Sequence, residues 1–203
     1  MRGARTRAMS LASAAAFILC AVLIAAFADG PASASTAALP LTQRVLAAGE
    51  LAAMKPLSAP VVVRGASAWA TSFPKSSRKE ELARFRSLGF VAGIDENLVT
   101  PGNTDRYGLS LMEEFSSAKS ARTELAHAAA ANPTWTHFAV PGIPGAAGFE
   151  LAHGATGGRN VGFTDGPFYY IVGAGWLGGS SNAVSRAQLI AAALVLYQRV
   201  HSH

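Results

Sequence analysis

Cysteine is almost absent from this sequence, which has one among its 203 residues. That residue, Cys20, lies in an N-terminal apolar run that we expect to be removed, so the mature chain would hold no thiol. Disulfides, cysteine-ligated metals and thiol catalysis are then excluded. The mature protein must be stabilised by an ordinary hydrophobic core, and residues 35–203 are long enough to form one.

Charged residues are scarce as well, at 14% of the chain. Without Arg2, Arg5, Arg7 and Asp29 of the N-terminal segment, the 17 basic and 12 acidic residues become 14 and 11, and the net charge is about +3. No block of like charge occurs, and basic residues do not alternate with aromatic ones. Nucleic acid is therefore a poor candidate partner.

The chain also lacks any acid after Asp165, and this argues against its most tempting motif. Residues 173–178 match G-x-G-x-x-G and follow an expected strand. A dinucleotide site also needs a helix that begins within the motif and an acid about twenty residues later for the ribose. Here the helix begins only after Ser185. We predict a glycine-rich loop at residues 173–182 and no bound cofactor.

Histidine pairs with metal-ligand spacing are missing, and so is a G-x-S-x-G nucleophile elbow. The five histidines are His127, His137, His153, His201 and His203. Residues 65–69 come nearest to the elbow but lack its second glycine. We expect no metal site, and the sequence nominates no catalytic residue. Whether the protein is an enzyme stays open, and a non-catalytic role is favoured.

An export signal is present at residues 1–34. Three arginines precede the apolar residues 8–28, and Ala32-Ser33-Ala34 forms a small-residue cleavage site. We expect cleavage after Ala34 and a mature protein that works outside the cytoplasm, either secreted or in the cell envelope. The alternative is that the apolar run, which is near the length that spans a bilayer, is retained as an anchor.

Residues 35–41 are predicted to be a short tether and residues 42–203 a single domain. Three helices are expected, at residues 78–88, 118–131 and 186–200, with a weak one at 42–53. Ser77-Arg78-Lys79-Glu80 and Ser185-Arg186-Ala187-Gln188 are patterns typical of capping boxes, and Gly89 is a natural helix C-cap.

Strand-like runs occur at residues 61–63, 90–96, 107–115, 135–140, 148–153, 160–164 and 168–173. Asp165-Gly166 between the last two runs favours a tight hairpin. Mostly antiparallel strands with interspersed helices predict an α+β fold. We expect a single, mostly antiparallel sheet with helices packed mainly on one face and a long C-terminal helix.

Four residues are candidate ligand contacts: Glu113, His153, Tyr170 and Trp176. Strand alternation at residues 109–115 places Glu113 on one face with three apolar side chains. If that face is the core, Glu113 is a buried acid that needs a partner; alternatively Ser110, Met112 and Glu114 point inward, or the strand end is exposed. His153 is in phase with apolar residues of its strand. Trp176 lies in the expected glycine loop and could be a lid or a partner contact.

Four segments resemble those of exported, high-GC actinobacterial proteins of unknown function: residues 88–93, 109–115, 140–145 and 160–163. The resemblance implies a location in the cell envelope and transfers no catalytic residue. The α+β layout also loosely resembles the PsbP/Mog1-like fold of some mycobacterial lipoproteins, which is an analogy of fold alone.

These observations favour an exported binding or accessory domain without catalysis. A pocket between the sheet and the C-terminal helix, closed by the loop at 173–182, would hold a small or apolar ligand. One alternative is an envelope protein-interaction module that uses residues 141–145 and Trp176. Another is a hydrolase that uses Glu113 or His153. Membrane contact is expected only through an uncleaved signal segment.

Overall fold

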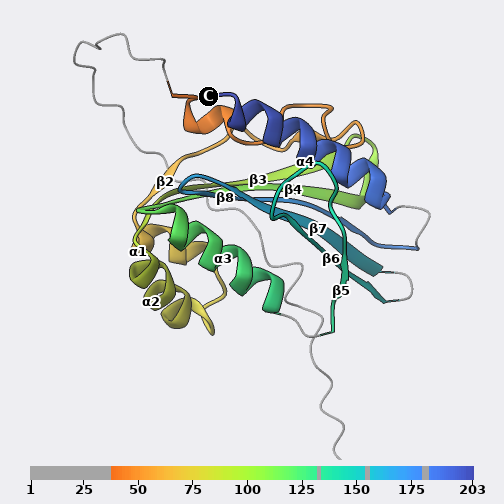
Figure 1. The fold of residues 1–203 in the computed structure, drawn as a ribbon. Helices are drawn as coiled ribbons and strands as arrows, with labels where there is room; N and C mark the ends of the chain where they lie inside the picture. The colour runs from red at the N-terminus through yellow and green to blue at the C-terminus, as the bar shows by residue number, and fades with distance from the viewer. Residues whose placement is uncertain (1–37, 132–133, 154–155, 180–182) are drawn as a thin grey trace, which may run out of the picture.

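A computed structural model describes residues 38–131, 134–153, 156–179 and 183–203, and Figure 1 shows its fold. The predicted export signal and residues 35–37 of the predicted tether lie outside the described residues. The elements in chain order are η2 (Leu41–Gln43), β1 (Lys55–Pro56), β2 (Val63–Arg64), α1 (Ala66–Trp69), η3 (Ala70–Ser72), α2 (Arg78–Leu88), β3 (Phe90–Thr100), β4 (Asn103–Phe115), α3 (Ala118–Ala130), β5 (Thr136–Phe138), β6 (Ala147–His153), β7 (Thr156–Asp165), β8 (Phe168–Trp176) and α4 (Arg186–His201).

The strands form one eight-stranded sheet in the described part of the chain, in the order β1-β3-β4-β8-β7-β6-β5, with β2 also pairing with β3. All of these pairings are antiparallel. Three connections are hairpin-like, β3–β4, β6–β7 and β7–β8, while β4 and β8 are joined through α3 and the strands β5 to β7. The two longest hairpins therefore meet at the β4–β8 pair.

Helices cover both faces of the sheet (Figure 1). Of the four α-helices in the described residues, α1, α2 and α3 lie on one face, and α4 lies on the other together with the described N-terminal segment. The α+β prediction with one mostly antiparallel sheet and a long C-terminal helix is confirmed. The sequence did not show that the C-terminal helix stands apart from the others.

Strand alternation divides the core into two clusters. In β8, Tyr170 and Val172 belong to the cluster under α4, whereas Tyr169 belongs to the cluster under α1 to α3 and Ile171 packs against it. A strand buried on both faces is expected to carry mainly apolar residues. Strand β4 nevertheless contains two buried polar residues, Ser110 and Glu113. Under α4 much of the sheet face is covered by packed side chains of the first cluster. A cavity on this face lies beside residues 42–50, where Arg199 of α4 and Glu96 of β3 line it.

Helix boundaries follow the sequence closely, although one cap does not. Helix α2 has the predicted bounds and ends at Gly89 in the left-handed conformation, with φ of 68°. Ser185 and Gln188 form the predicted capping box of α4. The capping box expected at Ser77 is wrong: its side chain makes no cap hydrogen bond and instead donates to the carbonyl of Pro74 at 3.3 Å.

Several strands are longer than the runs predicted for them, and one predicted helix does not form. The weak helix expected at residues 42–53 is a single 3-10 turn, η2, followed by turns. The strand expected at 61–63 keeps only Val63, and Val61 is exposed. Leu39, in the predicted tether, is buried in the core. The β7–β8 hairpin is confirmed, but its turn is Gly166-Pro167, because Asp165 pairs with Phe168.

None of the helices in the described residues has both the length and the apolar character needed to cross a bilayer.

Candidate functional site

Three of the sequence-predicted ligand contacts, Glu113, Tyr170 and Trp176, do not converge on one site. Tyr170 and Glu113 come from neighbouring strands but point to opposite faces of the sheet, into different core clusters or their margins. Trp176 is the last residue of β8, and His153 is the last residue of β6. The side chain of His153 is not part of the described structure. No single site can therefore be built from Glu113, Tyr170 and Trp176.

Tyr170 has a structural role. It is fully buried, stacks on Phe163 with ring centroids 4.8 Å apart, and its hydroxyl accepts a hydrogen bond from Arg44 at 2.9 Å. Burial raises the pKa of Tyr170 to about 12, and the Arg44 guanidinium opposes that rise. Arg44 also lies 4.0 Å above the ring of Phe168. The two side chains satisfy each other inside the core and leave nothing for a ligand.

Trp176 is buried at 2% exposure and is not part of a mobile loop. Residues 173–176 belong to β8, so the glycine-rich loop begins later than predicted. The strand glycines make room for large neighbours, since a Cβ on Gly157 would lie 2.2 Å from the Trp176 ring and one on Gly175 would lie 2.1 Å from Tyr107. Close packing accounts for Gly173 and Gly175 of the motif, and the expectation of a lid at Trp176 is corrected.

Glu113 is the predicted residue that does lie in a site. Its side chain is 2% exposed and faces the α1 to α3 layer, where its Oε1 accepts a hydrogen bond from the indole Nε1 of Trp69 at 2.8 Å. Its Oε2 is buried without a partner. Burial raises the pKa of Glu113 to about 7, against the smaller lowering effects of the Trp69 hydrogen bond and Arg84. Both faces of β4 are buried at this point, because Ser110 and Met112 are buried on the opposite face, so the two alternatives weighed for Glu113 do not exclude each other.

A cavity of about 190 Å³ adjoins Glu113 between the sheet and the α1 to α3 layer, and much of its wall is apolar. Its lining residues come from β3, β4, β8, α1, η3, α2 and α3, with Phe73 from the chain after η3: Trp69, Ser72, Phe73, Arg84, Asp95, Leu109, Leu111, Glu113, Glu124, Ala128, Tyr169 and Ile171. We call this space the acid cavity. A small concave site with an apolar wall and a few polar groups is the usual form of a small-molecule site.

Two further polar side chains of the acid cavity end in buried atoms without a partner. They are the Oδ1 of Asp95 and the hydroxyl of Tyr169. Burial raises the pKa of Asp95 to about 6. Burial, and next the Glu113 charge, raises the pKa of Tyr169 well above its usual range. Unpaired buried polar atoms are costly and rare, so three around one cavity mark it as a candidate binding site.

Strand pairing brings these three groups together. Glu113 lies directly opposite Tyr169 across the β4–β8 pair, while across β3–β4 it lies opposite Gly93, two residues from Asp95. Asp95 and Glu113 are therefore diagonal neighbours on one face of the sheet, at a spacing of about 7–8 Å. Sequence reasoning missed Asp95 and Tyr169. The available signal for Asp95 was its position, because it is a polar residue in a strand-like run whose alternate residues face the core.

The cation of the acid cavity is already engaged. Arg84 in α2 forms ion pairs with Glu81 in the same helix and with Glu124 in α3. Its guanidinium also lies 4.3 Å from the ring centre of Phe85. Arg84 thus connects α2 to α3 along the wall of the cavity, and its ion-pair partners are carboxylates other than Asp95 and Glu113.

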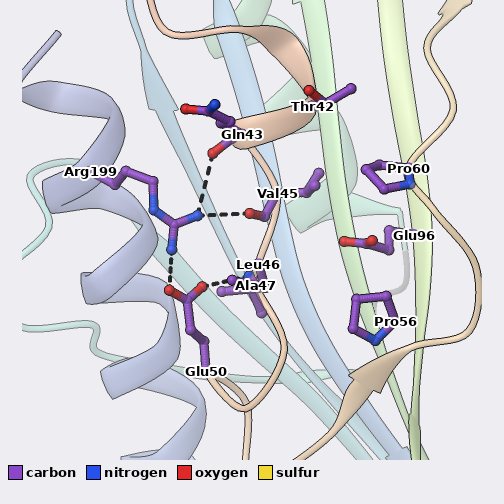
Figure 2. A pocket seen from close by; sticks show the side chains of 10 residues that line it. All are labelled: Thr42, Gln43, Val45, Leu46, Ala47, Glu50, Pro56, Pro60, Glu96 and Arg199. Atoms are coloured by element: carbon purple, nitrogen blue, oxygen red, sulfur yellow. Dashed lines mark hydrogen bonds and ion pairs between the residues drawn. The ribbon is translucent and has the colours of Figure 1, made fainter.

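A second, larger cavity of about 470 Å³ lies on the other face of the sheet, beside the N-terminal segment (Figure 2). Arg199 of α4 donates to the carbonyls of Gln43 and Val45 and forms an ion pair with Glu50, which also accepts from the amide of Ala47. These contacts hold residues 43–50 against α4 (Figure 2).

Across this second cavity, Glu96 has its Oε2 buried without a partner, and burial raises its pKa to about 7. It is a single unpaired group. The opposite wall is formed by an internally satisfied network, so the second cavity offers less to a ligand than the acid cavity does.

The arrangement of the acid cavity can accept hydrogen bonds from a ligand. The hydrogen-bond partner of Glu113 is an indole rather than a histidine, so the feature that would favour a hydrolase is missing at this residue. Among the described residues, no three His, Cys, Asp or Glu side chains are grouped so that they could hold a metal ion.

Comparison with known proteins shows that this α+β domain shares its overall fold with a solved structure. No protein-family model and no curated protein matches the chain. Among solved structures, the extracellular domain of PknH from Mycobacterium tuberculosis is similar, with a TM-score of 0.54 and 14% sequence identity over 80% of this chain and 95% of that chain. At this identity the likeness shows the fold alone. The resemblance to actinobacterial exported proteins and the PsbP/Mog1-like analogy stay predictions.

Proposed function

We propose that this chain is an exported binding domain of the cell envelope that holds a small ligand in the acid cavity and catalyses no reaction. The observation that carries the proposal is the group of three buried, unpaired polar atoms around one apolar cavity, on Asp95, Glu113 and Tyr169. A ligand with hydrogen-bond donors would relieve their desolvation cost. The site differs from the predicted one, which lay under α4.

The direct test is native mass spectrometry of the protein purified after export from a bacterial host. A reproducible excess mass that vanishes on denaturation is expected. The matched variants are Leu109→Trp, which fills the acid cavity, and Val195→Trp on the exposed surface of α4. Both must keep a cooperative melting transition. Loss of the excess mass in Leu109→Trp alone supports the proposal, whereas a bare mass in the parent protein, or equal retention in both variants, overturns it.

The envelope location rests on the export signal at residues 1–34, and the likeness to an extracellular domain agrees with it. Cell fractionation followed by N-terminal sequencing tests it. A protein outside the cytoplasm that begins at Ser35 is expected. An intact N-terminus in a cytoplasmic fraction would contradict the export proposal, and an intact N-terminus in the membrane would replace cleavage by anchoring.

The second candidate is an envelope protein-interaction module. It is favoured by Leu57 and Val61, which are 59% and 62% exposed in the segment that joins β1 to β2. Of the surface predicted for this role, Trp176 and Ile143 are buried, whereas Pro141, Gly142, Pro144 and Gly145 are exposed. Cross-linking in cells, compared between the parent protein and Leu57→Ser/Val61→Ser, separates this candidate from ligand binding.

A further inference from the structure

We infer that the acid cavity takes a small organic cation, namely a primary ammonium group attached to a compact apolar body. This inference rests on the proposed function and names the chemical class of its ligand. It is carried by the charge balance, the hydrogen-bonding capacity and the walls of the cavity.

The charge balance leaves two acids without a cation. Arg84 is the one basic side chain among the described residues that line the acid cavity, and it pairs with Glu81 and Glu124. Asp95 and Glu113 therefore have no ion-pair partner among the described residues, and the charge of Asp95 adds to the burial that raises the pKa of Glu113. A positive group placed between them would remove that cost, because opposite charges stabilise the ionised form of a carboxyl.

The hydrogen-bonding capacity matches an ammonium group. An ammonium nitrogen carries three donors and no acceptor. The unpaired atoms around the cavity are the carboxyl oxygens of Asp95 and Glu113 and the hydroxyl of Tyr169, all of which can accept. The diagonal placement of the two acids leaves a gap that a single nitrogen can bridge with two hydrogen bonds. Donors attached to a charge make hydrogen bonds about twice as strong as neutral ones.

The walls select an organic cation of limited size. Leu111 and Ile171 form the sheet side of the cavity, while Trp69 and Phe73 contribute aromatic surface from the helical side. Aromatic faces attract a cation within about 6 Å, and the aliphatic side chains would bury an apolar body. The volume of about 190 Å³ limits that body to the size of a single ring or a short branched chain. An anionic ligand would meet two acids and is disfavoured.

Binding of this ligand class is coupled to protons. The charged and titratable groups around the site are Asp95, Glu113, Tyr169, Arg84, Glu81, Glu124 and His127. Burial holds the pKa of Asp95 at about 6 and that of Glu113 at about 7. Because only the ionised acids attract an ammonium group, the affinity should rise with pH through this range, and binding should release protons.

The experiment is isothermal titration calorimetry of the exported protein, freed of bound ligand by dialysis, at two pH values, about 5 and about 8. The probes are phenethylamine, its neutral analogue 2-phenylethanol and the acid 3-phenylpropionate. The variants are Glu113→Gln and Asp95→Asn, with Glu114→Gln as the matched control, since Glu114 is a half-buried neighbour of Glu113 on the same strand. Circular dichroism confirms that each variant is folded.

Phenethylamine is expected to bind more tightly than either analogue and more tightly at the higher pH. Loss of one charge-assisted contact in Glu113→Gln or Asp95→Asn should weaken binding by about tenfold or more, and Glu114→Gln should not. Equal or tighter binding of the alcohol or the acid, or unchanged binding in both folded cavity variants, overturns the cation inference. If the cation inference fails in this way, an excess mass that is lost only in Leu109→Trp still supports the proposed function. A bare mass of the parent protein overturns both the proposed function and the cation inference.

Discussion

At the scale of single residues, one glycine determines whether the acid cavity has its observed form. Gly93 in β3 lies beneath the indole of Trp69, and a Cβ built there would be 2.8 Å from the ring. Trp69 in turn donates the hydrogen bond that holds Glu113. The position of the buried acid therefore depends on the absence of a side chain in the neighbouring strand.

We predict that Gly93→Ala destabilises the fold by about 1–3 kcal/mol, because the added methyl group must displace the Trp69 ring. Urea denaturation measures the change. Gly158→Ala in β7 is the control, since a Cβ there meets nothing nearer than 3.7 Å. If the two variants unfold at the same urea concentration, the close approach of Gly93 and Trp69 is not as described.

At the scale of secondary-structure elements, two serines with the same sequence pattern have different roles. Ser185 accepts from the amide of Gln188, whose side chain in turn accepts from the amide of Ser185. Ser77 precedes α2 in the same S-x-x-E/Q pattern, yet its backbone dihedrals are helical and its side chain makes no cap bond. An N-cap residue needs an extended backbone, and Ser77 does not have one.

The expected outcome is that Ser185→Ala lowers the free energy of unfolding by about 1 kcal/mol. Ser77→Ala, its counterpart before α2, should change it by less than about 0.5 kcal/mol. Thermal denaturation of both variants alongside the parent protein provides the measurement. A larger loss in Ser77→Ala than in Ser185→Ala would contradict this assignment of the caps.

The elements that sequence patterns could predict are those defined by local signals. Helix α2 and the cap at Gly89 follow from helical spacing and a glycine, and the turn at Gly166 follows from local turn chemistry. The acid cavity was not predictable in this way, because Asp95 and Tyr169 meet Glu113 only through strand pairing that is distant in the chain. Trp176 was misplaced for the same reason: its glycine neighbours accommodate cross-strand rings rather than a flexible loop.

At the scale of the whole molecule, the buried acids set the pH dependence of stability. Burial raises the pKa of Asp95 to about 6 and those of Glu96 and Glu113 to about 7, while in the unfolded chain they titrate near 4 to 4.5. The folded state therefore holds more protons between these values, so its stability falls as pH rises from about 4 to 7. The Arg186 and Arg159 contacts hold the pKa of Glu150 at about 2, which removes stability as pH falls from about 4.5 toward 2.

We predict a stability maximum near pH 4 to 5 for the ligand-free protein. Urea unfolding at pH values between 3 and 8 measures the profile. Glu113→Gln keeps an acceptor for Trp69 but has no titrating proton, so it should remove on the order of 3 kcal/mol of the decline between pH 4.5 and 7. Glu114→Gln should leave the profile parallel to that of the parent. Stability that rises steadily from pH 4 to 7 would contradict the burial of these acids.

The pairing of β4 with β8 gives the acid cavity a place in the order of folding. The β3–β4 and β7–β8 hairpins each join strands that are close in the chain, whereas β4 and β8 are separated by α3 and three further strands. Such a distant pairing closes a long loop and is slow to form. Because Glu113 and Tyr169 face each other across that pair, neither hairpin alone carries the site. A molecule that occupies the cavity therefore selects chains whose last long-range pairing is complete, and it slows the opening of the whole sheet rather than of one local segment.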